Sequence, residues 1–296
     1  MREGNRVARM SVLPLLEVVA SERLTPRMQR VTLGGSGSPA LRALDAVPPA
    51  AHVRLLFAEP GAPVVLPTPG PYGLSWPDDH ARPYARSMTV RSLDGVRGEM
   101  TIDIALHGDS AAGRWATAAR PGDPAGIVGP GGGWTPPADA TEVLLAGDEA
   151  ALPAIAALLE WLPKHALVHT AIEVEDALDE QVLARPVRWV HRARGETLVD
   201  VVRARPVPDG AAAWVAGEGH VVKAIRETLR LGRGLGRSHC HAIRYWTQGR
   251  SHEDSEKTFG VARAEAARRG IELVTTQDVH EMSYELMTGG FRLPVV

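Results

Sequence analysis

The feature that most limits the folds open to this chain is the order of elements within residues 82–133. Residues 87–91 carry β-branched side chains between basic ends, and residues 100–106 alternate apolar and other side chains, as short strands do. Residues 111–119 have a helix-forming composition and follow the strand-breaking Gly108. A Gly-rich run ends the stretch. This order of strand, strand and helix predicts an anion site at the start of the helix.

Basic side chains favour the same interpretation. The first turn of a helix carries unpaired N–H groups and a partial positive charge. With Arg86 nearby in space, this turn would hold a diphosphate. Arginines at strand ends are more often simply solvated, so these residues by themselves leave both interpretations open.

The chain before this stretch is expected to supply further strands of a small antiparallel barrel, because short strands with turn signals between them recur there. The expected strands are residues 15–20, 28–33 and 52–57. Residues 59–79 are dense in Pro and Gly and predict an irregular loop. Its Tyr72 and Trp76 either line a ligand pocket or pin the loop to the barrel.

Beyond residue 137, strands alternate with helices, which predicts a parallel sheet with crossover helices. Ligands of such sheets bind at the carboxyl ends of the strands, where Gly147 and Gly217 fall. The chain has no G-x-G-x-x-G, so the usual Rossmann fingerprint is absent. The expected strands are residues 142–146, 166–174, 188–190, 212–216 and 242–246, and the expected helices are 150–162, 179–183, 197–203 and 220–230.

The last part of the chain is expected to be an extension. Residues 255–269 predict an amphipathic helix, residues 271–275 a strand, and Asp278 the cap of a final helix. The apolar tail 291–296 covers a ligand pocket, packs on a second subunit to form a dimer, or docks on its own domain; these options stay open. The predicted domains are residues 1–137, 138–249 and 250–296.

Composition excludes several classes of function. A formal charge of −2 gives no reason to expect nucleic acid or an anionic membrane surface as a partner. Cys240 is the only cysteine, so this chain holds neither a disulfide framework nor an iron–sulfur cluster. His239 and His241 flank it on alternating faces of one expected strand, and no metal site is predicted. Because there is no membrane-spanning apolar run and no signal peptide, a cytoplasmic protein is predicted.

Two longer sets of residues follow an ordered pattern. The first set is Arg82-Pro83, Arg86, Thr89, Arg91, Asp103, Leu106-His107-Gly108, Trp115-Ala116, Arg120-Pro121-Gly122-Asp123 and Gly129-Pro130-Gly131-Gly132. The second is AGDEAALPAI at 146–155, WVAGE at 214–218 and RYWTQG at 244–249. Together they resemble the FAD-binding and nicotinamide-binding halves of the siderophore-interacting proteins, flavin reductases of the ferredoxin-NADP reductase superfamily.

The resemblance implies a six-stranded antiparallel FAD-binding barrel, a parallel-sheet nicotinamide-binding α/β domain and a C-terminal helical extension. It also implies FAD, reduction of this flavin by NADPH or NADH, and single-electron reduction of a ferric siderophore, which releases the iron because ferrous iron binds oxygen chelators weakly. Arg86 would pair with the diphosphate and Thr89 with the flavin edge. The implied cofactor-binding residues are Arg86, Met88, Thr89, Arg91, Asp103, His107, Gly108, Gly113, Trp115, Gly147, Asp148, Glu149, Gly217, Glu218 and Trp246.

Some residues depart from the family pattern. Met88 stands in place of a tyrosine that stacks on the isoalloxazine, and Thr247 in place of Arg or Lys near the nicotinamide cofactor. Ser110, Ala111 and Gly113 replace the Gly, Pro and Ser of the phosphate turn. Two alternatives therefore stay open beside the reductase. One is a pocket reused to bind or cyclise an apolar metabolite without net redox change, and the other is a ferric-siderophore binding or delivery protein.

Overall fold

The computed structural model of the chain describes residues 12–44, 46–59, 61–70, 73–77, 82–250, 261, 264–266, 268 and 269. The chain divides into two compact units, each described here by itself. Unit 1 is Met1–Thr135 with Pro153–Leu162 and Leu178–Ala184, and unit 2 is Pro136–Leu152 with Pro163–Ala177 and Arg185–Val296. The division into domains 1–137, 138–249 and 250–296 stays a prediction.

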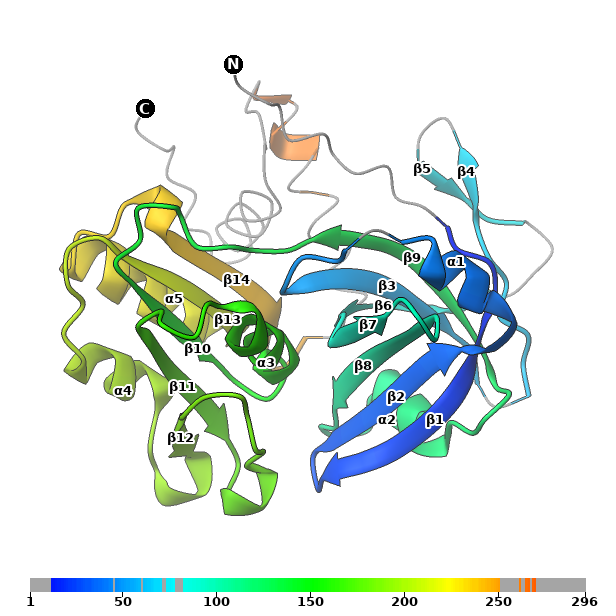
Figure 1. Cartoon of the computed structure of the whole chain (residues 1–296), viewed down its shortest axis with the longest axis horizontal. Coiled ribbons are helices and arrows are strands. Elements are labelled where there is room, and N and C mark those ends of the chain that lie inside the picture. Colours follow the sequence, from blue (N-terminus) through cyan, green and yellow to red (C-terminus); the bar gives the residue numbers. More distant parts are fainter. Residues whose placement is uncertain are drawn as a thin grey trace. The chain divides into compact units, whose positions relative to one another are not determined.

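Unit 1 contains a seven-stranded antiparallel sheet in the order β6-β3-β9-β1-β2-β8-β7, which curls into a barrel (Figure 1). Its strands are β1 (Leu16–Thr25), β2 (Met28–Gly34), β3 (Ala51–Phe57), β6 (Tyr84–Thr89), β7 (Ser92–Asp94), β8 (Glu99–Ala105) and β9 (Pro124–Gly132). The short strands β4 (Thr68–Gly70) and β5 (Gly73–Ser75) pair separately, and the helices are α1 (Ser38–Arg42), α2 (Ala111–Ala118) and α3 (Leu152–Trp161).

Alternation along the strands explains the core of unit 1. Leu16, Phe57 and Ile102 are almost completely buried, and they point to the inside of the curled sheet. α2 adds Trp115 and Ala116 from its buried face to the same core. The helix that was expected to mark the anion site is therefore fixed to the barrel by apolar contacts.

The antiparallel barrel followed by a parallel sheet is confirmed, but the predicted number of six barrel strands is wrong. β7 is the additional edge strand, and it pairs with β8 across a tight turn. Asp94 stabilises this turn because its Oδ1 accepts hydrogen bonds from the N–H groups of Val96 (2.9 Å) and Arg97 (2.8 Å). The strand expected over residues 87–91 begins earlier, at Tyr84, and ends at Thr89.

Unit 2 contains a five-stranded parallel sheet in the order β12-β11-β10-β13-β14. Its strands are β10 (Glu142–Gly147), β11 (Val168–Val174), β12 (Arg188–His191), β13 (Ala211–Glu218) and β14 (Cys240–Trp246), and its helices include α4 (Leu198–Ala204) and α5 (Gly219–Glu227). α4 and α5 contact each other and cover one face of the sheet (Figure 1). All five strands were expected.

The helix predicted over residues 179–183 is wrong. A single 3-10 turn spans Ala177–Asp179, and the chain is irregular from there to β12. Asp179 is buried, and its carboxylate accepts hydrogen bonds from the backbone N–H (3.1 Å) and Nη1 (2.6 Å) of Arg27, which belongs to the same unit. This contact between distant parts of the chain outweighs the local preference for a helix.

The expected helix over residues 255–269 agrees with the helical backbone at 261, 264–266 and 268, where Ala266 is buried. Tyr72, the strand expected at 271–275, the helix after Asp278 and the apolar tail lie outside the described residues. A dimer through residues 250–296 stays a prediction. Among the described residues, no helix has the length and apolar character that crossing a membrane requires.

Candidate functional site

One face of β6 carries the first candidate residues. Tyr84, Arg86 and Met88 share this face because side chains alternate along a strand. Tyr84 and Met88 are partly buried against the core of unit 1. The Arg86 guanidinium carbon lies 5.7 Å from the centre of the Tyr84 ring, and Arg86 Nη1 donates to the carbonyl of Ala85 at 3.0 Å. Arg86 thus lies along β6, over its own aromatic neighbour.

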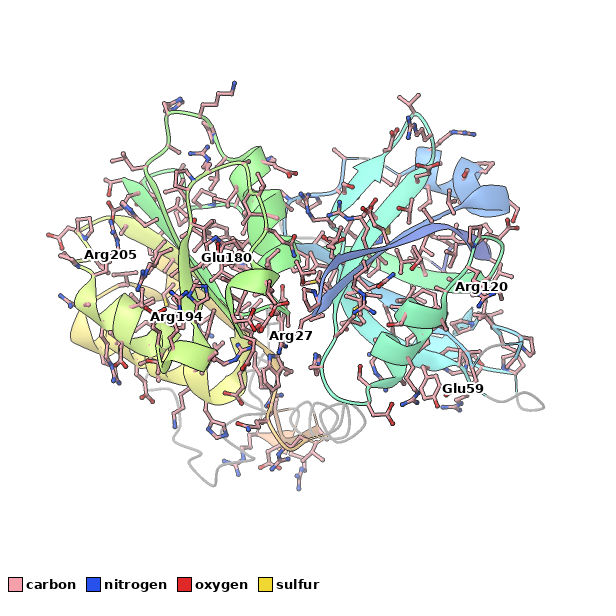
Figure 2. All side chains as sticks on the ribbon, turned by 90° about the horizontal axis from the view of Figure 1, so that it is seen from below. Arg27, Glu59, Arg120, Glu180, Arg194 and Arg205 are labelled. Carbon is pink, nitrogen blue, oxygen red and sulfur yellow. The ribbon has the colours of Figure 1, made fainter. Side chains whose placement is uncertain are left out.

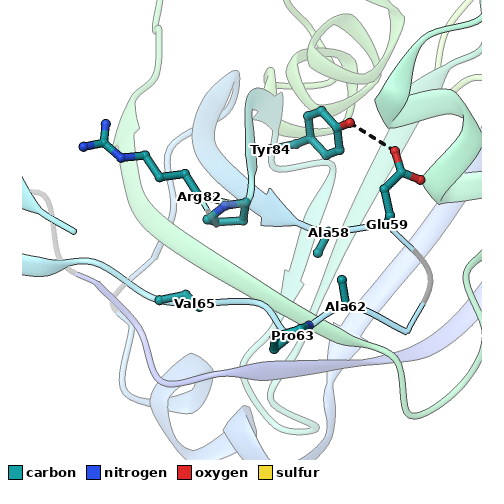
Figure 3. A pocket seen from close by; sticks show the side chains of 8 residues that line it. Ala58, Glu59, Ala62, Pro63, Val65, Arg82 and Tyr84 are labelled. Carbon is teal, nitrogen blue, oxygen red and sulfur yellow. Dashed lines mark hydrogen bonds between the residues drawn. The ribbon is translucent and has the colours of Figure 1, made fainter. Parts of the chain in front are cut away.

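The first turn of α2 lies close to this face. Ser110 caps the helix, and its Oγ accepts a hydrogen bond from the N–H of Gly113 at 3.0 Å. Arg114, in the first turn, pairs with Asp109 at 2.7 Å and lies 3.6 Å from Glu59 Oε1. The Tyr84 hydroxyl donates to the same Glu59 oxygen at 3.0 Å (Figure 3). Tyr84 and Glu59 therefore connect Arg86 with the start of α2.

A row of aromatic rings holds α2 against the barrel. The Phe57 ring centre is 5.4 Å from that of Tyr84 and 5.2 Å from that of Trp115. Only 7% of Trp115 is exposed. Trp115 therefore belongs to the core of unit 1, and the contact with a cofactor that the family resemblance implies for it stays a prediction.

Asp103 and Arg91 have structural partners. Asp103 is buried, and its carboxylate accepts hydrogen bonds from Arg30 Nε (2.7 Å) and Nη2 (2.8 Å), which raises the pKa of Arg30. Arg91 Nε lies 3.8 Å from Asp103, and Arg91 Nη1 donates to Glu160 Oε2 at 2.9 Å. The side chains of both candidates are therefore engaged in ion pairs inside unit 1.

The other barrel candidates differ in exposure. Thr89 is buried at the end of β6. His107 and Gly108 lie in the loop between β8 and α2, and both are exposed. Gly108 has a φ of +53°, and a Cβ at this position would meet no other atom within 4 Å among the described residues. This loop can therefore meet a ligand that lies on the start of α2.

The six candidates of unit 2 lie at or directly after the carboxyl ends of β10, β13 and β14, and Asp148 joins these ends. Its Oδ2 accepts hydrogen bonds from Trp246 Nε1 (2.7 Å) and the N–H of Glu218 (2.9 Å). Its Oδ1 accepts them from the N–H groups of Ala150 (3.0 Å) and Ala151 (3.4 Å). Burial raises the pKa of Asp148 to about 6, although these hydrogen bonds act in the opposite direction.

Gly217 is required by this arrangement. It has a φ of +140°, and a Cβ at this position would lie 2.5 Å from Asp148 Oδ2. The next residue, Glu218, caps α5 by accepting hydrogen bonds from the N–H groups of His220 (2.6 Å) and Val221 (3.1 Å). Asp148 and Glu218 thus position the turn between β13 and α5 rather than facing outward as free carboxylates.

Glu149 pairs with Arg192, which also contacts Glu173 and Glu175 at 3.3 Å each. This cluster links the carboxyl ends of β10, β11 and β12. At the other side of the sheet, Thr247 follows β14, and its buried Oγ1 has no hydrogen-bond partner within the part of the chain that the structure describes. A hydroxyl without a partner beside a strand end suits a site that a ligand completes.

Sequence analysis missed Tyr84, Glu59, Arg114 and Arg192. Tyr84 had a signal, since it precedes Arg86 by two positions and Met88 by four on the same strand face. Arg114 falls within the expected helix 111–119, but its contacts with Glu59 and Asp109 are tertiary or local pairings that no spacing shows. Arg192 follows a strand, where a solvated arginine is the usual expectation.

The barrel residues fit a dinucleotide's diphosphate. In the first turn of α2, the N–H groups of Ala111 and Ala112 have no acceptor within the helix. Arg86 and Arg114 add positive charge on the same side of the barrel, joined through Tyr84 and Glu59. Met88 offers an apolar surface where a flavin ring would rest. The start of α2 departs from the family pattern in sequence, yet these two N–H groups stay available as donors.

Comparisons with known proteins agree with both halves of the chain. The family model described as "Siderophore-interacting FAD-binding domain" matches residues 17–134, and the model "Siderophore-interacting protein" matches residues 140–249. The chain is 31% identical over 251 residues to ferric vibriobactin reductase ViuB of Vibrio cholerae, which covers 81% of this chain and 91% of ViuB. It is 34% identical over 221 residues to an NADPH-dependent ferric-chelate reductase of Escherichia coli, covering 71% and 84%.

A solved structure agrees as well. The crystal structure of a siderophore utilization protein from T. fusca superposes with a TM-score of 0.72 at 36% identity, covering 83% of this chain and 96% of that one. FAD is therefore the cofactor of the barrel. From its sequence pattern, its fold and these matches, the chain belongs to the siderophore-interacting protein family.

Proposed function

We propose that this protein is an FAD-dependent NAD(P)H oxidoreductase that reduces a ferric siderophore and so releases its iron. The observation that carries the proposal is the connection of Arg86 to the first turn of α2 inside the segment that the FAD-binding family model matches. Relatives that match most of the chain are named as ferric reductases. These relatives do not support the reuse of the pocket for an apolar metabolite.

Residues of the barrel bind and orient the flavin. Arg86 and the N–H groups at the start of α2 hold the diphosphate, and the exposed loop at Gly108 borders it. Met88 packs against the ring in place of the family's tyrosine. When bound, FAD takes two electrons from the nicotinamide and passes them singly to ferric iron. The ferrous product binds oxygen chelators less tightly than ferric iron does, which completes the release.

The carboxyl edge of the unit 2 sheet is proposed to bind NAD(P)H. Asp148 fixes the ends of β10, β13 and β14 through four hydrogen bonds and so pre-forms the turn at Gly217. A ligand that enters this edge meets Glu218 and the Thr247 hydroxyl without first having to order them.

The proposal is tested with the purified protein. We expect flavin absorption bands after reconstitution with FAD, and NAD(P)H oxidation that depends on a ferric catecholate or hydroxamate chelate, with ferrous iron captured by a colorimetric chelator. Met88→Tyr is expected to tighten FAD binding by about 2- to 13-fold, since an aromatic pair adds about 0.5–1.5 kcal/mol. Met88→Leu is the matched control, because it keeps the apolar contact without a ring. A protein that binds no FAD in a fluorescence titration contradicts the proposal.

A further inference from the structure

Glu59 stands between the two basic groups of the diphosphate site. It follows β3, its Oε1 accepts the Tyr84 hydroxyl proton in a 3.0 Å hydrogen bond, and the same oxygen lies 3.6 Å from Arg114 Nη2. The Tyr84 ring lies 5.7 Å from the Arg86 guanidinium carbon. A negative side chain thus lies where the negative diphosphate has to bind.

The charges near this point are nearly balanced. Arg86, Arg114 and the helix end favour an anion, whereas Glu59 and Asp109 oppose it. Two like charges about 4 Å apart repel in water by about 1 kcal/mol, which corresponds to about a fivefold change in affinity. The Glu59 side chain is 56% exposed, so its carboxylate is not part of the buried core of the barrel.

A hollow beside Glu59 gives its side chain room to move. It has a volume of about 240 Å³, and its lining includes Ala58, Ala62, Pro63 and Val65 next to Glu59 and Tyr84 (Figure 3). Figure 2 shows Glu59 at the surface of the barrel unit. A change of rotamer therefore suffices to take the carboxylate off Arg114, without any change in the strands.

We propose that Glu59 is a resident anion of the diphosphate site, which the flavin diphosphate must displace from Arg114 in order to bind. Glu59 thereby lowers the affinity for FAD and for other diphosphates, and makes binding less sensitive to salt. The inference rests on the proposed FAD site in the barrel, and it adds a residue that sets how tightly this site holds its ligand.

The test compares Glu59→Gln with the original protein and with Glu22→Gln as a matched control. Glu22 is an exposed residue of β1, and its change alters the net charge equally. FAD affinity is measured by quenching of flavin fluorescence at low and at high salt, and inorganic pyrophosphate binding by calorimetry on protein free of FAD. We expect about fivefold tighter binding of both ligands to Glu59→Gln, with a steeper loss of affinity as salt rises. Glu22→Gln is expected to stay within about twofold of the original protein.

A second variant separates charge from anchoring. Tyr84→Phe keeps the Glu59 charge and removes its hydrogen bond, so we expect a smaller gain of about twofold. Weaker FAD binding by Glu59→Gln, or an unchanged salt dependence, overturns the proposal, because Glu59 would then be a ligand or a structural residue. If pyrophosphate binds more tightly to Glu59→Gln while ferric chelates are not reduced, the reductase proposal fails and the resident anion stands. If Glu59→Gln gains affinity for neither ligand, the resident anion is rejected whether or not the reductase is active.

Discussion

Restoring the family's serine at position 113 should reveal a competition between two hydroxyl groups for one place. A Cβ at Gly113 would lie 2.8 Å from Ser110 Oγ, much closer than the 3.4 Å at which it would meet Leu106 Cδ2. Ser110 can avoid this overlap by rotating, but it then loses its hydrogen bond to the N–H at position 113. The helix thus gains a better residue at 113 and loses its cap at 110.

The magnitude follows from these two effects. Loss of a serine cap costs about 1 kcal/mol, and replacing Gly by Ser inside a helix returns about 0.5 kcal/mol. Gly113→Ser alone should therefore destabilise α2 by about 0.5 kcal/mol. In a Ser110→Gly background no cap remains to be lost, so the same change should stabilise the helix by about 0.5 kcal/mol. The coupling between the two positions is then about 1 kcal/mol.

Amide hydrogen exchange of residues 113–118 measures this coupling locally, without assuming that the whole chain unfolds in one step. If the effects of the two positions were additive, Gly113→Ser would change the exchange rates by the same factor in the original protein and in the Ser110→Gly background. We expect this factor to be about fivefold larger, towards faster exchange, in the original protein. Thr117→Ala serves as a control for helix propensity, because Thr117 is an exposed residue of α2 away from the cap. Alanine at this position should slow exchange equally in the original protein and in the Ser110→Gly background. Additive effects within about 0.3 kcal/mol would show that Ser110 and Gly113 do not compete for space.

Three further predictions concern the carboxylates and the Asp148 turn. Burial raises the pKa of Asp148 in the folded protein to about 6, above its ordinary 3.8, so its contribution to stability is complete below pH 3.8 and is lost as the pH rises through 6. Unfolding midpoints should therefore fall between these pH values, and Asp148→Asn should remove this pH dependence. Gly217→Ala should destabilise the protein by about 2 kcal/mol more than Gly195→Ala, since both have positive φ but only position 217 meets another atom, Asp148 Oδ2; equal thermal shifts would contradict this. Asp103→Asn should lower the free energy of unfolding, measured in urea, by about 3 kcal/mol, because it leaves Arg30 without its buried partner. Asp94→Asn, at an exposed turn, should change the urea midpoint far less. Similar midpoints for the two variants would show that the buried pair adds no stability.

Periodicity predicted the parallel sheet well, because its strands are buried and apolar and lie between helices of ordinary composition. β9 was missed. It contains Gly126, Gly129, Gly131 and Gly132, whose sequence favours a loop, yet it pairs with both β1 and β3. A side chain at position 126 would clash, because a Cβ there would lie 2.5 Å from Leu66 Cδ2. The need for glycine thus depends on a distant part of the chain.

The candidate site stays a prediction, and its contacts could not be read from the sequence. Arg86 is linked to Arg114 of α2 only indirectly, through Tyr84 and Glu59. Asp103 and Asp148 were selected by position in a pattern, and each carboxylate is bound inside the protein. Short-range spacing shows which residues share a strand end, but it does not show which of them already have partners. Glu59 could not be found for the same reason, since its role depends on a contact across 25 positions with Tyr84.

The way the chain is shared between the two units limits how the gene can be cut. Unit 1 takes in Pro153–Leu162 and Leu178–Ala184, so a fragment that stops at Thr135 lacks Glu160, the partner of Arg91, and Asp179, the partner of Arg27. Such a fragment would lose the ion pair of Arg27 with Asp179 and that of Arg91 with Glu160. Chimeras and truncations of this protein therefore have to carry these two distant peptides along with the barrel.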